Sequence, residues 1–180
     1  MLTLGLSIAP VFLASRYSIS VPVPFLLAAT LFIGGSIIMG EAFGFYERVW
    51  WWDLALHGSS AIGFGLIGFL FIFMLFEGDR FAAPPVAIAF LSFCLAVTVG
   101  SIWEIFEYAM DSIFGLNMQK SGLDDTMGDL IVNGLGAIIG AVSGYFYLSG
   151  REKRLFAPFI GQFVDANRRL YRRTKEKLRR

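Results

Sequence analysis

Acidic and amide side chains interrupt the apolar sequence between residues 98 and 136, where two long hydrophobic stretches meet. They form two groups, each with the three- or four-residue spacing that puts side chains on one face of a helix: Glu104, Glu107 and Asp111, then Asp125, Asp129 and Asn133. Burying a charge in apolar surroundings costs free energy unless the charge is paired or holds a cation. The pattern therefore indicates a functional polar site.

A histidine is available to the same site. Asp53 and His57 share a helix face at the start of an earlier apolar stretch, and His57 is the one histidine in the sequence. The nearby bases, Arg48 and Lys120, both fall in predicted loops. Carboxyl groups this close cannot all stay ionised without a counter-charge. We therefore predict one polar site made of seven residues: Asp53, His57, Glu104, Glu107, Asp125, Asp129 and Asn133.

A divalent cation is the first candidate for the missing counter-charge, with His57, Glu104 and Asp129 as its ligands. Oxygen ligands with one nitrogen suit zinc, manganese or iron, whereas oxygen ligands alone suit calcium or magnesium. A shared proton is the alternative, in which case the site needs no cofactor. A single histidine excludes zinc sites built mainly from imidazole.

Ordinary helix chemistry explains part of this pattern without any ligand. Asp53 and Asp125 lie where helix N-caps are expected, and His57 alone is typical of an interfacial histidine. Glu104 does not fit this explanation, because a negative charge near a helix C-terminus is disfavoured by the helix dipole. Glu104 is therefore the strongest single indication of a site.

The composition predicts a membrane protein. Hydrophobic residues make up 56% of the 180 residues, mean hydropathy is +0.65, and 19 residues are phenylalanine. Several apolar stretches approach the roughly 20 residues that a membrane-spanning helix needs. We predict an all-α polytopic bundle over residues 1–150, with about five spans: residues 1–15, 25–43, 53–76, 86–113 and 125–148.

The charge distribution separates a tail from this bundle. Residues 1–150 hold 11 acidic and 4 basic side chains, whereas residues 151–180 hold 3 and 11. Apolar residues recur in the tail with helical spacing: Phe156, Phe159, Ile160, Phe163, Leu170 and Tyr171. This favours a basic amphipathic helix on anionic lipid headgroups over a nucleic-acid-binding arm. The positive-inside rule then puts the C-terminus in the cytoplasm and the polar site on the outer side.

Small residues continue one face of the last predicted span. Gly136, Gly140 and Gly144 follow Asp129 and Asn133 at four-residue spacing. Such spacing lets membrane helices approach closely. We expect these glycines to pack against another helix and to hold the polar residues in a fixed position.

Two family resemblances rest on the same residues. Asp53-Leu-Ala-Leu-His57, Glu104 and Asp129-Leu-Ile-Val-Asn133-Gly-Leu-Gly136 resemble the DxxxH, ExxQ and DxxxNxxG motifs of VanZ-like membrane proteins, with Glu107 at the usual glutamine. The stretch from Trp103 to Ala137, WEIFEY…GLDDTMGDLIVNGLGA, is similar to the YjdF-like inner-membrane family. The resemblance covers about residues 45–148 and implies a small helical bundle in the bacterial inner membrane.

Two classes of function follow from these observations. In the first, the polar pocket binds a divalent cation, or the headgroup of a lipid or envelope precursor. In the second, the protein is an accessory subunit of a larger membrane complex, and the polar cluster keeps its helices in register. The sequence contains no HExxH, GxSxG or Walker motif. The absence of these motifs leaves enzymatic activity an open question.

Overall fold

The structure is a computed structural model, and it describes residue 16, residues 18–76 and residues 83–169. Helices account for the regular structure in these ranges. In chain order they are α2 (Val23–Ile33), the π-helix η1 (Gly34–Ala42), α3 (Phe45–Arg48), α4 (Trp52–Leu75), α5 (Pro85–Phe114), α6 (Leu123–Leu148) and α7 (Ala157–Ala166). The predicted all-α fold is confirmed.

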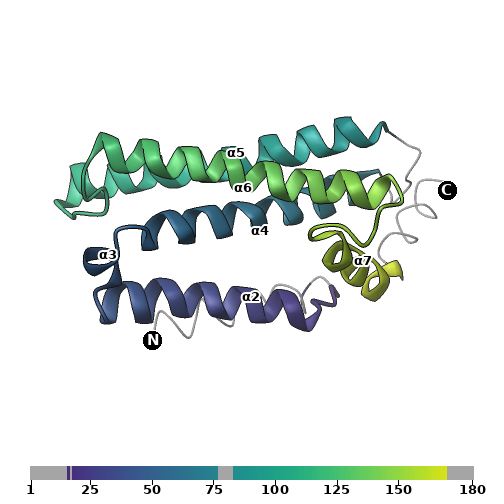
Figure 1. Ribbon diagram of the computed structural model, residues 1–180, viewed down its shortest axis with the longest axis horizontal. Helices are drawn as coiled ribbons and strands as arrows, with labels where there is room; N and C mark the ends of the chain where they lie inside the picture. The colour runs from purple at the N-terminus through teal and green to yellow at the C-terminus, as the bar shows by residue number, and fades with distance from the viewer. Residues whose placement is uncertain (1–15, 17, 77–82, 170–180) are drawn as a thin grey trace.

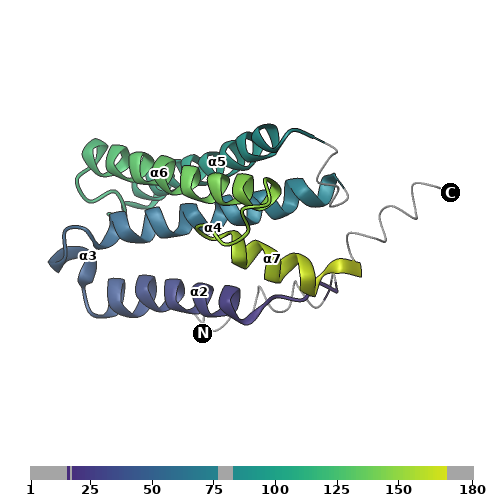
Figure 2. The same ribbon diagram turned by 45° about the vertical axis from the view of Figure 1, so that its right-hand side comes forward.

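Among the described residues, four helical segments are long and apolar enough to cross a membrane: Val23–Ala42, Trp52–Leu75, Pro85–Phe114 and Leu123–Leu148. They match four of the five predicted spans within a few residues. The remaining predicted span, residues 1–15, lies outside the described residues. α4, α5 and α6 lie side by side, and α2 runs along one side of α4 (Figures 1 and 2).

Proline and glycine set the limits of the longest helix. Pro85 is the first residue of α5, where a missing backbone N–H costs nothing. Gly115 follows the last turn with a φ of 65°, a conformation that glycine adopts without strain. The Asp111 carboxylate then accepts hydrogen bonds from the backbone N–H groups of Met118 and Gln119, at 2.7 and 2.8 Å. Asp111 therefore orders the loop that leads into α6.

Glycines bring α4 and α6 into backbone contact. A Cβ atom built on Gly140 would lie 2.8 Å from both the Cα of Gly65 and the carbonyl oxygen of Ile62. A Cβ atom on Gly136 would collide with the carbonyl oxygen of Gly58, and one on Gly144 with the ring of Phe69. These positions exclude any larger side chain.

Aromatic side chains fill the bundle at the end where α4 finishes, which we call the closed end. Phe69 and Phe73 stack with ring centroids 5.6 Å apart, and the Tyr147 ring meets both edge-on. Ile160 of α7 packs into this cluster and is fully buried. The apolar side of α7, predicted to contact lipid, thus contacts the protein here. Residues 170–180 of the predicted tail lie outside the described residues.

A buried asparagine joins α7 to the entrance of α2. The Asn167 Oδ1 atom accepts a hydrogen bond from the Ser20 backbone N–H, and its Nδ2 atom donates to the Ser20 carbonyl oxygen, both at 2.7 Å. Phe25 packs beside Phe159 and Phe163, with ring centroids 6.4 and 5.6 Å away. These contacts attach the beginning of α2 to the closed end.

The rest of α2 makes few contacts with the bundle. None of its residues, all of which the structure describes, is buried. Farther along, the Trp52 indole N–H donates to the carbonyl oxygen of Gly35 at 3.2 Å, and the hydroxyls of Ser36 and Tyr46 are 2.9 Å apart. The first described span is therefore attached near both ends and open along its middle.

Candidate functional site

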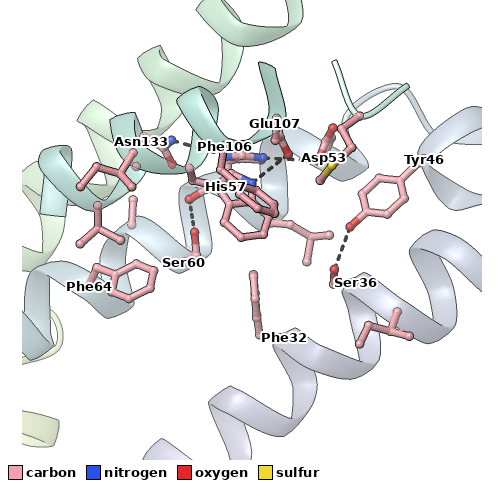
Figure 3. Close-up of a pocket in the computed structure, with 18 of the residues that line it drawn as sticks. Phe32, Ser36, Tyr46, Asp53, His57, Ser60, Phe64, Phe106, Glu107 and Asn133 are labelled. Carbon is pink, nitrogen blue, oxygen red and sulfur yellow. Dashed lines mark hydrogen bonds and ion pairs between the residues drawn. The ribbon is translucent and has the colours of Figure 1, made fainter. Parts of the chain in front are cut away.

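A cavity of about 910 Å³ lies between the first described span, α4 and α5 (Figure 3). Most of its wall is hydrophobic, with Phe32, Phe64 and Phe106 among the lining side chains. Polar residues gather near the start of α4: Ser36, Glu41, Tyr46, Asp53, His57, Glu107 and Lys120. We call this region the polar end of the molecule.

His57 is the centre of the polar end. Its Nε2 atom lies 3.6 Å from Asp53 Oδ1 and 3.9 Å from Asp129 Oδ2. Its Nδ1 atom lies 3.5 Å from Glu104 Oε1 and 3.5 Å from Asn133 Nδ2. Residues from α4, α5 and α6 therefore meet at one imidazole, as the helix spacing predicts.

Two of these carboxyl groups are buried without hydrogen bonds. Glu104 is 4% exposed and Asp129 is 1% exposed. Both oxygens of each side chain find no hydrogen-bond partner among the described residues. By its position in α5, Glu104 is on the order of 15 Å from the helix end, at about 1.5 Å per residue. Leaving a buried charge unpaired costs several kcal/mol, so these oxygens call for a proton or a cation.

The other predicted site residues have different surroundings. Glu107 is 8% exposed and accepts a hydrogen bond of 2.8 Å from the Trp103 indole N–H. Asp125 lies in the first turn of α6 and is less buried than Glu104 and Asp129. Asn133 is buried beside His57 and fills the space over Gly100, where a Cβ atom would come within 2.9 Å of its Nδ2.

In the part of the chain that the structure describes, two sets of side chains lie close enough together that they could hold a metal ion. One is Asp53, His57 and Asp129, and the other is His57, Glu104 and Glu107; in each set the ligand atoms lie within 4.8 Å of one another. The predicted ligands His57, Glu104 and Asp129 are thus divided between two sets. Spacing along each helix cannot show which imidazole nitrogen faces which carboxylate, and Glu104 and Asp129 face opposite nitrogens. Asp125 belongs to neither set.

Positive charge is scarce at the polar end. Among the cavity-lining residues that the structure describes, Lys120 is the one lysine or arginine, and its Nζ atom lies 4.1 Å from the centre of the Tyr46 ring. Burial raises the pKa of the Tyr46 phenol, and nearby carboxylates, Asp53 first, add to that rise. Tyr46 therefore remains a neutral hydrogen-bonding group beside an acidic site.

The cavity includes residues that the sequence did not mark as site residues. Ser36 and Tyr46 approach from η1 and α3, and Trp103 lies one helical turn before Glu107. The i, i+4 spacing of Trp103 and Glu107 is a signal that connects the two in the sequence. Nothing in the sequence connects Ser36 to Tyr46, because the contact depends on how η1 returns to α3.

Comparison with known proteins agrees with a membrane fold. Residues 1–150 match the family model described as predicted membrane protein (DUF2238). A Thermotoga maritima protein described as uncharacterized is 33% identical over 126 residues, which cover 70% of this chain and 63% of that relative. No solved structure matches the chain.

The matched region bears on the two resemblances. It contains the stretch Trp103 to Ala137, and the YjdF-like name fits the matched family loosely. The VanZ-like resemblance remains a prediction. On the match over residues 1–150, the chain belongs to the DUF2238 family of predicted membrane proteins.

Proposed function

We propose that this protein binds a divalent cation at its polar end, in the bacterial inner membrane. The observation that carries the proposal is the set of buried carboxylate oxygens on Glu104 and Asp129, which have no hydrogen-bond partner among the described residues. A cation bound beside His57 neutralises Asp129 in one ligand set or Glu104 in the other, at a place where neighbouring bases are scarce. The His57 ring offers the one nitrogen ligand.

Each set of ligands is suited to a metal with open coordination positions. Three protein ligands leave at least one position free in a four-coordinate zinc site, and more in a six-coordinate site. Mixed oxygen and nitrogen ligands favour zinc, manganese or iron over calcium. Asp53, His57 and Glu107 also line the cavity, so a molecule in the cavity can reach the metal.

A shared proton is the main competing account. It satisfies Glu104 and Asp129 if each of the two carboxyl groups holds a proton beside His57, and it needs no metal. Under that account, substitution of Glu104 or Asp129 does not change metal content, and the cluster serves to hold α4, α5 and α6 in register. The two accounts therefore differ in a quantity that can be measured directly.

The arrangement of the helices supports an outward-facing site. α3 and the loop between α5 and α6 lie at one end of the bundle, and α7 lies at the other (Figure 1). Arg151, Lys153 and Arg154 precede α7 at that other end. Because basic residues favour the cytoplasmic side, we propose that the polar end faces outward and the C-terminus faces the cytoplasm.

The test is metal analysis of the purified protein and four variants. Glu104→Gln and Glu107→Gln change the set on the Nδ1 side of His57, Asp129→Asn changes the set on the Nε2 side, and Asp124→Asn is the control. Asp124 is exposed and lies on the same helix as Asp129. After dialysis against Mn²⁺ or Zn²⁺, wild type and Asp124→Asn should hold metal. The variants of the true ligand set should lose it.

This experiment also identifies the metal set. Loss of metal in Asp129→Asn alone assigns the cation to Asp53, His57 and Asp129. Loss in both glutamine variants, with Asp129→Asn unchanged, assigns it to the other set. Unchanged metal content in all four variants, or no bound metal in the wild type, contradicts the proposed function.

A further inference from the structure

We propose that the cavity binds a phosphate-bearing amphiphile, with its hydrocarbon chain along the apolar wall and its phosphate at the polar end. This inference rests on the proposed cation, whose coordination the phosphate oxygens would complete. It adds a class of ligand to a site that otherwise holds only an ion.

The apolar wall is built for a hydrocarbon chain. A volume of about 910 Å³ is within the range of about 300–1,000 Å³ found for small-molecule sites. Phe32 and Phe64 are each 38% exposed, and Phe106 is 45% exposed, although all three line the cavity. Side chains from the first described span, α4 and α5 thus present apolar surface to the same space. A bound chain would cover that surface.

The attachment of α2 keeps this space open. Near its start, α2 is fixed to α7 through Ser20, Asn167 and Phe25. Toward the other end of the span, Gly35 and Ser36 are hydrogen-bonded to Trp52 and Tyr46. Two such attachments hold the middle of the span apart from α4 and α5, so the cavity belongs to the packed state of the helices.

The polar end selects the chemistry of the headgroup. A cation held by three protein ligands has free positions, and phosphate oxygens are ligands that Mg²⁺ and related cations accept readily. Lys120 lines the same end and supplies a second positive charge. The hydroxyl groups of Ser36 and Tyr46 add hydrogen-bonding groups beside them.

A lipid tail without a selected headgroup is the simpler alternative, since any gap between membrane helices fills with hydrocarbon. The two accounts differ in what they need. Binding of an unselected tail depends on the apolar wall alone. Binding of a phosphate-bearing amphiphile depends on the wall, the cation and the headgroup together.

The experiment measures retention of radiolabelled dodecyl phosphate by the full-length protein in dodecyl maltoside micelles, which contain no phosphate, with and without Mn²⁺. Ser60→Phe fills the cavity from α4, and Ser59→Phe is its matched control. Both serines donate a hydrogen bond to the carbonyl oxygen three residues earlier, but Ser60 lines the cavity and Ser59 is exposed. Val99→Phe fills the cavity from α5 and is used if Ser60→Phe fails to fold.

We expect Mn²⁺-dependent retention in wild type and in Ser59→Phe, and retention at least about tenfold weaker in the cavity-filling variant, the equivalent of about 1.4 kcal/mol. Manganese content should stay the same in all of these proteins. Excess dodecanol should not displace the probe, because it lacks the phosphate.

Each contrary result contradicts a specific part of this proposal. Bound manganese without retained dodecyl phosphate contradicts binding of the amphiphile but not binding of the cation. Retention that is independent of Mn²⁺, or that dodecanol abolishes, shows an unselected tail. Complete displacement by inorganic phosphate, with no effect of the cavity-filling variant, shows that free phosphate is the ligand. Absence of bound manganese overturns the proposed function, and this inference with it.

Discussion

The two ends of the α4–α6 bundle differ in how they satisfy their buried groups. At the closed end, Phe69, Phe73 and Tyr147 pack together, and the buried Asn167 side chain makes three hydrogen bonds. At the polar end, Glu104 and Asp129 are equally buried, yet their oxygens have no hydrogen-bond partner among the described residues. The buried polar side chain at the closed end is therefore fully hydrogen-bonded, whereas the two buried carboxyl groups at the polar end are not.

This contrast indicates which end supplies the stability. Apolar packing and complete hydrogen bonding at the closed end stabilise the bundle. Buried carboxylates at the polar end oppose folding unless a ligand compensates them. In the proposed function, a cation bound beside His57 supplies this compensation, and the polar end is where it binds.

The largest expected effect comes from breaking the contact on which both ends depend. Gly140→Leu should prevent stable assembly, because the new side chain would meet the backbone of Gly65 and Ile62. Overpacking costs about 1–3 kcal/mol where side chains can shift, and more where backbone blocks them. The measurement is folded yield and thermal midpoint in detergent.

Gly134→Leu is the control for that change. Gly134 lies on the same helix, and a Cβ atom there would meet nothing within 4 Å. It should behave like the wild type. Equal stability of both leucine variants would show that α4 and α6 do not pack through this glycine face.

An intermediate effect should follow from Asn167→Ala at the closed end. It removes the partner of the Ser20 backbone groups and should lower the free energy of unfolding by about 1–3 kcal/mol. Asp165→Asn is the comparison, because Asp165 forms a surface ion pair with Arg168, and such pairs contribute about 0–1 kcal/mol. Thermal unfolding of the two variants measures the difference. If Asn167→Ala is as stable as Asp165→Asn, the closed end does not depend on this attachment.

The smallest expected effect is at the polar end. In metal-free protein, Asp129→Asn should leave the free energy of unfolding within about 1 kcal/mol of the wild type, and not below it, because the amide removes a buried charge. Melting in the presence of a chelator measures this, with Asp124→Asn as the control. A large loss of stability would show that Asp129 already has a stabilising partner in the metal-free fold.

The sequence predicts the helices better than it predicts their contacts. Hydropathy places four of the spans, since each is a continuous apolar stretch, and proline and glycine mark the ends of α5. The π-helix η1 was not predicted, although the Gly34-Gly35 pair lies at its start. Within η1, Gly35 and Ser36 contact Trp52 and Tyr46, and the spacing of apolar residues does not indicate these contacts.

For the site, too, the sequence predicts which residues come together better than it predicts their contacts. Helical spacing correctly brings Asp53, His57, Glu104, Asp129 and Asn133 to one place, because each faces the inside of the bundle. The sequence does not show that His57 separates two carboxylate sets, since that depends on the orientation of the ring. It also misses the attachment by Asn167, which joins residues 147 positions apart.

The most direct test of the central claim is the electron spin echo modulation of Mn²⁺ bound to the protein, prepared without a histidine tag. His57 is the one histidine in the chain, so ¹⁵N-labelled histidine marks this residue alone. A cation at the polar end predicts a nitrogen modulation that changes on ¹⁵N-histidine labelling and is absent from His57→Gln. Bound manganese with no histidine nitrogen in its coordination sphere, or no bound manganese, would contradict the account.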